Sequence, residues 1–409
     1  MIGRISRRRV LAGAAATFAI GRARSVHAAA SSPGISAGEI KLGTTAYYSG
    51  PASTAAAYGQ AQVSYFQMVN DRGGINGRKV NLISLDNAFS PPKALEQTRR
   101  LVESDEVFAI AGSLGTPTNV AIQKYLNGKG VPNLFLTSGA ERFNDPKEFP
   151  WIVPFYPIYV QQGAVFAKHI LRMRPNTKIA VQFENDDLGR DYVKGLKLGL
   201  GDKAVAMIVK ELSHELSDPT IDSQILDFKA SGADVLIQFT QSKFAAQGIR
   251  VAAGLDWHPL HIVCSNAGSI GTTFLPAGAE ASKGVVTATW ERNPADPAQA
   301  DHPAVVEFKA FAAKYMPNLD LNNTAALPGY NNAYMIGQVL QRCGDELTRD
   351  NLLRQATTLK DAAPPMFIDG IGVYNSPTDY RAIHHLQLTR FDGTTLVPLG
   401  AAVSLDDAG

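Results

Sequence analysis

The regular alternation of strand-like and helix-like segments constrains the fold of this chain more than any other feature of its sequence. Short apolar runs that favour strands occupy residues 40–46, 80–85, 107–112 and 131–137. Helical patterns lie between them, over residues 53–72, 92–103 and 119–127. Strands that alternate with helices predict a parallel sheet covered by helices on both faces. We therefore expect the first part of the chain to form a doubly wound α/β lobe.

The same alternation restarts after residues 149–159, where three prolines stand among aromatic residues. Strands are expected at 178–184, 205–210, 235–240, 261–264 and 285–290, and helices at 159–173, 191–200, 221–230 and 243–253. Three further helices (303–315, 330–341, 349–357) and a strand-like tail (371–374, 386–391) follow a proline-containing loop at 293–297. The prediction is an α/β fold of two doubly wound parallel-sheet lobes joined by a three-segment hinge. The first lobe would comprise 36–154 with 290–370, and the second 155–289 with 371–409.

The first thirty residues have the pattern of an export signal. A basic start at 4–9 precedes a short apolar run at 10–20, and three alanines at 28–30 offer a cleavage site. Residues 6–11 resemble the twin-arginine (Tat) type, although a Sec signal with additional arginines explains them equally well. We expect a signal peptide at 1–30 and a periplasmic protein. Without the six arginines of this segment, the net charge of +2 becomes −4, which argues against binding to nucleic acid.

Motifs of catalysis and metal binding are missing from the sequence. It contains no G-x-S-x-G elbow, no phosphate-binding loop, no G-x-G-x-x-G fingerprint and no H-E-x-x-H. The acidic residues at 184–187 lack the spacing of a calcium loop and are expected to cap a helix. His214 is expected in a solvated loop, and His384 and His385 in a surface strand. We expect no enzymatic activity, no metal and no cofactor.

Two cysteines, Cys264 and Cys343, lie about eighty residues apart in the sequence. Cys264 falls in an apolar strand-like run and Cys343 near the end of a predicted helix. A disulfide is chemically allowed in an exported protein. We expect two buried free thiols instead.

Loops rich in hydroxyl groups and glycine follow two of the predicted strands. The first contains Ser113, Gly115 and Thr116, and the second contains Ser138, Gly139 and Ala140. Glycines let backbone N–H groups approach a small anionic or polar ligand closely. Each loop alone is also compatible with an ordinary capping turn. Together they favour a binding site at the carboxyl ends of the strands.

Several short motifs resemble those of a known family. Ser49-Gly50-Pro51, Tyr58-Gly59 and the run NDRGGINGR at 70–78 are similar to the opening of the type I periplasmic solute-binding proteins. The similarity is greatest to the leucine/isoleucine/valine-binding proteins of ABC importers. It implies a small-molecule ligand held by closure of two lobes, an ABC permease of the inner membrane as partner, and a monomer. A receptor of the same fold that signals to a regulator is the alternative.

The resemblance also implies roles for individual residues. The two loops above would hold the ligand carboxylate, and Tyr58 would line the same pocket. On the second lobe, Leu188 stands where amino-acid binders commonly have an aromatic residue. Independently of the resemblance, the side chain of Gln241 would suit a ligand that carries a carboxylate or an amide. Asn266 stands where such binders carry an acid for the ligand's ammonium group. The predicted ligand is therefore a small carboxylate-bearing solute, either branched-chain amino acid-like or an aromatic or aliphatic acid.

Overall fold

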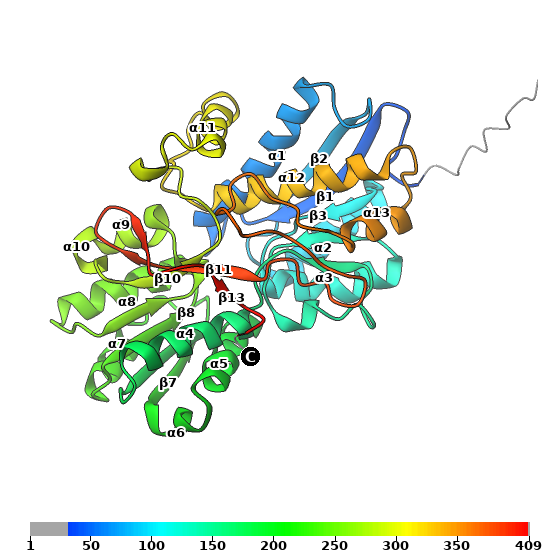
Figure 1. Cartoon of the computed structure of the whole chain (residues 1–409). Helices are drawn as coiled ribbons and strands as arrows, with labels where there is room; N and C mark the ends of the chain where they lie inside the picture. Colours follow the sequence, from blue (N-terminus) through cyan, green and yellow to red (C-terminus); the bar gives the residue numbers. More distant parts are fainter. Residues whose placement is uncertain (1–31, 408–409) are drawn as a thin grey trace, which may run out of the picture. The chain divides into compact units, whose positions relative to one another are not determined.

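The computed structural model describes residues 32–407, and two β-sheets organise them (Figure 1). The predicted signal peptide at 1–30 lies outside the described residues. The chain passes between the sheets three times: after the fifth strand, after the tenth, and before the eleventh. The predicted fold class, an α/β fold of two lobes with parallel sheets, is confirmed.

The first sheet has five parallel strands in the order β2-β1-β3-β4-β5. Its members are β1 (Glu39–Ala46), β2 (Lys79–Asp86), β3 (Ala109–Ala111), β4 (Asn133–Leu136) and β5 (Ile152–Pro154). Of the three inner strands, β3 and β4 are buried throughout, as expected for parallel strands covered on both faces. Their apolar runs are therefore continuous rather than alternating.

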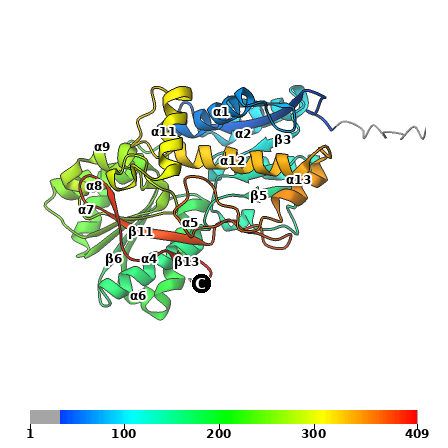
Figure 2. The same ribbon diagram turned by 45° about the horizontal axis from the view of Figure 1, so that its top comes forward.

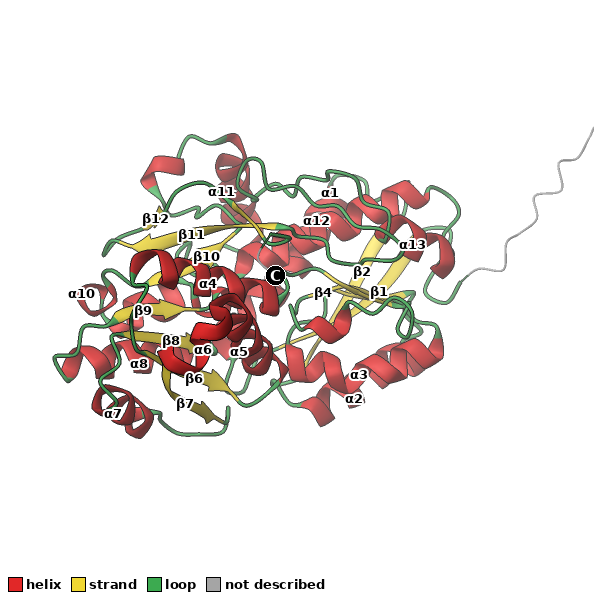
Figure 3. Cartoon of the chain, turned by 60° about the horizontal axis from the view of Figure 1, so that its bottom comes forward, coloured by secondary structure: helices red, strands yellow, loops and turns green. Residues whose placement is uncertain are grey.

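Helices cover both faces of the first sheet (Figure 3). They are α1 (Ala56–Asp71), α2 (Pro91–Arg99), α3 (Thr116–Lys129), α11 (Pro303–Tyr315), α12 (Ala326–Cys343) and α13 (Arg349–Ala356). Helices α11 and α12 contact α1, and α2 contacts α3. Figure 2 shows α12 lying along α1. The three helices that follow the second crossing therefore return to the first sheet, as the absence of strands between them predicts.

The second sheet has the strand order β12-β11-β10-β9-β8-β6-β7. Its strands are β6 (Ile179–Glu184), β7 (Ile208–His214), β8 (Val235–Phe239), β9 (Leu260–Val263), β10 (Val286–Thr289), β11 (His385–Phe391) and β12 (Leu396–Pro398), with β13 (Val403–Ser404) paired to β11. Strands β6 to β10 are parallel, whereas β11 and β12 are antiparallel. The tail thus adds an antiparallel edge to a parallel sheet.

Seven helices accompany the second sheet: α4 (Tyr159–Met173), α5 (Asp187–Leu200), α6 (Ala204–Met207), α7 (Asp222–Ala230), α8 (Ser242–Gly254), α9 (Leu275–Ala277) and α10 (Ala279–Ser282). Helices α4 and α5 pack closely because glycine stands at their crossing. A Cβ atom on Gly195 would lie 1.9 Å from the carbonyl oxygen of Val160, and one on Gly163 would lie 2.3 Å from that of Tyr192. No side chain fits at either position without separating the helices.

Three segments illustrate how the structure differs from the predicted elements. Residues 205–210 were expected as a strand, but α6 occupies the first of them and β7 begins only at Ile208. Val205 is 93% exposed, so its apolar character does not reflect burial in a sheet. Strand β5 lies in the proline-rich stretch for which no strand was predicted, at the edge of the sheet where proline is tolerated. Residues 371–374 form only isolated bridges through Val373.

The predictions for two histidines were wrong. His214 is the last residue of β7, 2% exposed, and its Nε2 lies 2.7 Å from the hydroxyl oxygen of Thr240. His384 is 4% exposed, stacks on Tyr374 and lies 3.0 Å from a carboxylate oxygen of Asp406. Both rings are satisfied by groups distant in the sequence. A polar local sequence therefore gave no indication of their burial.

Candidate functional site

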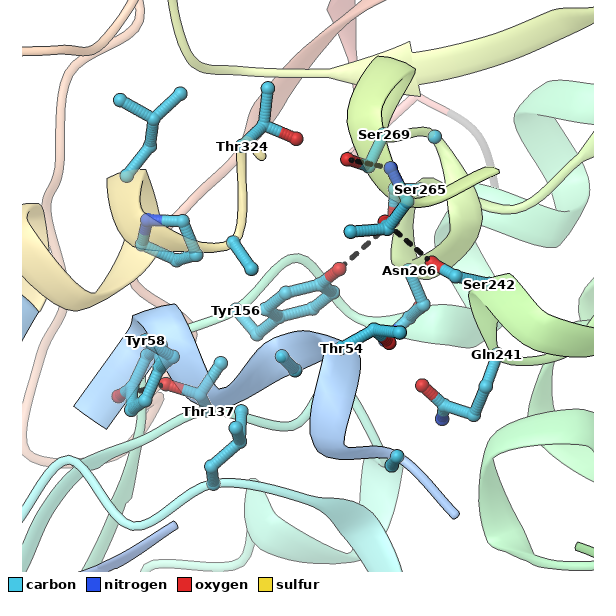
Figure 4. Close-up of a pocket in the computed structure, with 18 of the residues that line it drawn as sticks. Thr54, Tyr58, Thr137, Tyr156, Gln241, Ser242, Ser265, Asn266, Ser269 and Thr324 are labelled. Carbon is cyan, nitrogen blue, oxygen red and sulfur yellow. Dashed lines mark hydrogen bonds between the residues drawn. The ribbon is translucent and has the colours of Figure 1, made fainter. Parts of the chain in front are cut away.

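A cavity of about 160 Å³ lies at the carboxyl ends of strands from both sheets. The segments after β1, β3, β4 and β5 line one side of it, and those after β6, β8, β9 and β10 line the other. Figure 4 shows polar side chains from both sides directed into this space, among them Gln241, Ser265 and Tyr156. Ligands of α/β proteins commonly bind at this edge of a sheet. The cavity is thus the candidate binding site.

The first side of the cavity is built around the start of α3. Gly115 precedes this helix with φ of +100°, and a Cβ atom there would lie 2.1 Å from the hydroxyl oxygen of Tyr47. Only glycine meets both demands. The first N–H groups of a helix have no partner within it and favour an anion. Thr116, the first helical residue, lines the cavity at this point, so the site can accept a carboxylate.

A chain of hydrogen bonds joins the two sides of the cavity. The hydroxyl oxygen of Thr116 lies 2.7 Å from that of Ser138 and 3.4 Å from that of Tyr159. Tyr159 in turn accepts a hydrogen bond of 3.3 Å from Nδ2 of Asn266, on the other side. Burial raises the pKa of Tyr159, so its hydroxyl stays protonated. The chain fixes the positions of polar groups from both lobes relative to one another.

A second network lies behind Asn266 and orients it. The Tyr192 hydroxyl lies 3.2 Å from Oδ1 of Asn266 and 2.9 Å from Oε1 of Gln162. Ser265 donates to the same oxygen of Gln162 at 2.7 Å and lies 3.2 Å from the hydroxyl of Tyr156. With its Oδ1 facing Tyr192, Asn266 directs its NH₂ group toward Tyr159. The amide therefore offers a donor to the cavity side.

Aromatic side chains supply the apolar part of the lining. Trp290 packs edge-on against Tyr156, with ring centroids 4.7 Å apart. Tyr58 lines the cavity with its ring while its hydroxyl donates to the carbonyl of Gly112 at 2.8 Å. That hydroxyl also lies 2.7 Å from the hydroxyl of Thr137. Rigid aromatic surfaces suit a ligand that has an aliphatic or aromatic body.

Of the ten predicted site residues, the structure brings six to the cavity. They are Tyr58, Gly115, Thr116, Leu188, Gln241 and Asn266. They come from both sheets and from segments up to about two hundred residues apart. The resemblance to a family predicted that these six residues lie together. No local sequence pattern indicates it.

The other four predicted residues do not line the cavity. The Ser113 hydroxyl contacts Oδ1 of Asn119 and of Asn133 instead, and it is buried in the first lobe. Ser138 lies behind Thr116 and supports its hydroxyl. Gly139 packs against the backbone of Pro157, and Ala140 begins a short turn and is fully buried. These residues shape the loops without facing the cavity.

Glu291 was missed by the sequence analysis although it lines the cavity. It directly follows Trp290, which ends a segment that was predicted correctly as a strand. Its Oε1 accepts a hydrogen bond of 2.7 Å from Nδ2 of Asn331 in α12. Burial raises the pKa of Glu291 to about 8, and the hydrogen bond from Asn331 opposes this shift. A search for acidic residues directly after predicted strands would have found it.

Two further acids lie close together at the end of β6. Asp186 accepts a hydrogen bond from the N–H of Gly189 and caps α5, as the sequence predicted. Glu184 is 1% exposed, and among the described residues neither of its oxygens has a hydrogen-bond partner. Burial, and secondly the nearby Asp186, raise the pKa of Glu184 well above its usual value. Burial also raises the pKa of Asp186, to about 6. Glu184 does not line the cavity.

The buried position of Glu184 leads to a prediction for stability. An acid whose pKa is raised by folding binds more protons in the folded state, so its ionisation lowers stability as pH rises above its unfolded pKa. We expect Glu184→Gln to raise the Tm at pH 7–8 by about 2–4 °C, the shift that 1 kcal/mol produces in a mid-sized domain. The gain should shrink toward pH 4. Thermal melts between pH 4 and 8 measure it.

A matched control is Glu96→Gln, because Glu96 is exposed on α2. It should change stability by no more than about 0.5 kcal/mol at any of these pH values. A loss of stability in Glu184→Gln at pH 7 would instead mean that the carboxylate of Glu184 is itself stabilising.

Residues 32–407 contain no cluster of three His, Cys, Asp or Glu side chains suited to a metal ion. Cys264 and Cys343 are both buried and unpaired, which confirms the expectation of free thiols. Burial raises the pKa of Cys264 to about 12, so this thiol is not a reactive nucleophile. Within the same residues, no helix combines the length and the apolar character needed to cross a membrane.

Two sheets that share a cavity at their strand ends, lined by hydroxyl, amide and aromatic groups, define a two-lobed protein that binds small molecules. The chain belongs to the periplasmic binding protein family, whose model matches residues 39–395. The predicted resemblance is thereby confirmed.

Individual relatives agree with this assignment. The Leu/Ile/Val-binding protein homolog 7 of Brucella abortus is 26% identical over 243 residues, which is 56% of this chain, and the chain spans 59% of the length of that relative. A branched chain amino acid ABC transporter structure from Thermus thermophilus with bound valine superposes with a TM-score of 0.79 at 17% identity, over 90% of this chain and 96% of the other. A fatty acid ABC transporter substrate-binding protein from Thermomonospora curvata gives 0.75 at 19% identity, over 92% and 95%. At these identities the two structures establish the fold alone.

Proposed function

We propose that the protein is the periplasmic substrate-binding component of an ABC transporter. It captures a small carboxylate-bearing solute, branched-chain amino acid-like or an aromatic or aliphatic acid, when its two lobes close. It then delivers the solute to a permease in the inner membrane. The protein acts as a monomer and reaches the periplasm through its Tat or Sec signal.

One observation carries the proposal: Tyr159 connects polar groups of both lobes at the cavity. Its hydroxyl lies 3.4 Å from that of Thr116 and 3.3 Å from Nδ2 of Asn266. A solute placed among these groups is held by both lobes at once. Ligand binding and lobe closure are then a single event, which is the hinge-closure mechanism of two-lobed binding proteins.

The binding free energy that a small ligand requires supports lobe closure as the source of affinity. A ligand of roughly ten heavy atoms bound at micromolar strength needs about −8 kcal/mol, or about −0.8 kcal/mol per atom. That density of interaction requires contacts on nearly every side of the ligand. A single lobe would leave half of it in water. The names of the relatives, which mention leucine, isoleucine, valine and fatty acids, support a carboxylate as the shared feature.

The lobes of the proposal are 36–154 with 290–370, and 155–289 with 371–409. Tyr380 donates from its backbone to Asn144 and from its hydroxyl to the carbonyl of Pro150, both in the first lobe. We therefore propose that the third hinge segment extends to His384, just before β11. The residues that rotate on closure would lie at 155–158, 290–297 and near His384.

The direct test is a thermal-shift screen against amino acids, aromatic acids and short aliphatic acids. A ligand at about 100 times its Kd stabilises the folded state by about 2.7 kcal/mol, which corresponds to a Tm rise of roughly 5–10 °C. Because Trp290 lines the cavity, binding should also change the intrinsic fluorescence. Trp290→Phe should remove the fluorescence change, whereas Trp151→Phe, in the first lobe away from the cavity, should retain it. If no acid raises the Tm, or if a bound acid is chemically converted, the proposal fails.

A further inference from the structure

Glu291 is held firmly at the cavity by its neighbours in the chain. It forms an antiparallel bridge with Phe367, and the N–H groups on either side of this pair bond across at 2.7 and 2.9 Å. Asn331 fixes the carboxyl group: its Oδ1 accepts from the N–H of Met366 at 3.1 Å, so its NH₂ group must face Glu291. The direction of the carboxyl group is thus set before any ligand arrives.

The second carboxyl oxygen of Glu291 is open to the cavity. Asn331 occupies Oε1, whereas Oε2 has no hydrogen-bond partner among residues 32–407. Protein atoms do not fully enclose Oε2, so it retains contact with free space. Glu291 is half-buried and lines the cavity. An unpaired carboxyl oxygen is therefore directed at the place where a ligand would lie.

No cation of the described protein neutralises Glu291. Arg292 also lines the cavity, but its Nη1 donates to Gln299 and its guanidinium pairs with Asp369, which also lies 3.7 Å from His302. Lys243 lines the cavity with its stem, but its Nζ donates to the carbonyl of Asp218. The remaining titratable neighbours are phenols, Tyr58 in α1 and Tyr156 after β5, and burial raises the pKa of each. Both phenols therefore stay uncharged at physiological pH.

We propose that Glu291 receives a protonated amine of the ligand, so that the protein selects an amino-bearing carboxylic acid over the plain acid. The inference rests on the proposed function, because it assigns a partner within the same cavity. The start of α3 and the Thr116 hydroxyl take the ligand's carboxylate, and Glu291, which lies just after β10, supplies a negative charge for the amine. An amine buried without an anion would bind poorly. The amide of Asn266 is uncharged and cannot supply this anion, whereas the carboxylate of Glu291 can.

The direction in which ligand affinity changes with pH distinguishes two roles of Glu291. An ionised Glu291 would bind an amine, whereas a protonated Glu291 would donate a hydrogen bond to the ligand. Burial raises the pKa of the empty site's Glu291 to about 8, so binding of an amine must displace its proton. Affinity for an amine then rises with pH, by up to about tenfold per unit, until the pKa is passed. A ligand that accepted a hydrogen bond from protonated Glu291 would instead bind more weakly above that pH.

The experiment compares matched ligands that differ only in the amine. Leucine is paired with 4-methylpentanoate, and 5-aminopentanoate with pentanoate, in calorimetric titrations between pH 6 and 8.5. In at least one pair the amine should bind about tenfold or more tightly, with affinity that rises with pH and with release of a proton. Glu291→Gln keeps the shape and the bond from Asn331. It should weaken amine binding about 10–100-fold and abolish the difference within the pair.

The control is Glu184→Gln, another buried acid that does not line the cavity, which should leave the preference for the amine unchanged. Plain acids that bind as tightly as their amines in both pairs would overturn this inference while upholding the proposed function. So would an amine preference that survives in Glu291→Gln, or an affinity that falls as pH rises. If none of the four probes binds, and the wider screen of acids also fails, both proposals fall.

Discussion

Replacing Thr116 by valine should weaken binding of the captured acid about 10–100-fold. Valine preserves the shape of the side chain but removes the hydroxyl that lies 2.7 Å from Ser138 and 3.4 Å from Tyr159. A hydrogen bond to a charged group contributes about 1.5–3 kcal/mol, and each 1.4 kcal/mol is about tenfold in affinity. Titration calorimetry with the best ligand of the screen measures the loss.

Ser113→Ala provides the matched comparison for this variant. Both residues belong to the same loop, and both were predicted to hold the ligand. The Ser113 hydroxyl contacts Asn119 and Asn133 instead, so its removal should lower stability by about 1–3 kcal/mol and leave affinity unchanged. The reverse result, a large loss of affinity in Ser113→Ala and none in Thr116→Val, would show that the cavity is not the binding site.

Gly195→Ala should be among the most destabilising single-methyl substitutions in the protein, by about 3 kcal/mol or more. The added Cβ would lie 1.9 Å from the carbonyl oxygen of Val160, and the obstacle is backbone rather than a flexible side chain. Helices α4 and α5 would have to separate, and overpacking of a tight contact costs 1–3 kcal/mol or more. Urea denaturation, with an unchanged m-value, would measure the effect.

The control for this prediction is Gly128→Ala in α3. A Cβ atom there meets no atom within 4 Å, and alanine favours a helix over glycine by about 0.5–1 kcal/mol. This variant should be neutral or slightly more stable. Equal effects of the two substitutions would mean that the close approach of α4 and α5 is not required for stability.

The predictions for Thr116→Val and Gly195→Ala depend to different degrees on information that the sequence contains. The loop around Thr116 was identified from its hydroxyl groups and glycines, because such loops follow strands in a recognisable way. That Thr116 faces the cavity and Ser113 does not depends on the turn at Gly115, whose φ of +100° is not encoded in residue type alone. The contact at Gly195 involves Val160, an interhelical pairing that no sequence pattern specifies.

The same distinction applies to the buried polar groups. His214, His384 and Glu184 lie in polar local sequences, yet each is at most 4% exposed. Their burial depends on strands and loops that reach them from elsewhere in the chain. Glu291 was overlooked for a related reason: its importance comes from the cavity beside it and from Asn331 in α12.

The sequence by itself determined the alternation of strands and helices, and with it two α/β lobes, because apolar periodicity is a local property of the chain. It also determined the glycine- and hydroxyl-rich loops at the strand ends. Only the tertiary structure decided which of these groups face a common cavity, and that an unpaired carboxyl oxygen of Glu291 lies among them. Direction and burial of a side chain depend on neighbours far away in sequence, and those contacts exist only once both sheets have formed.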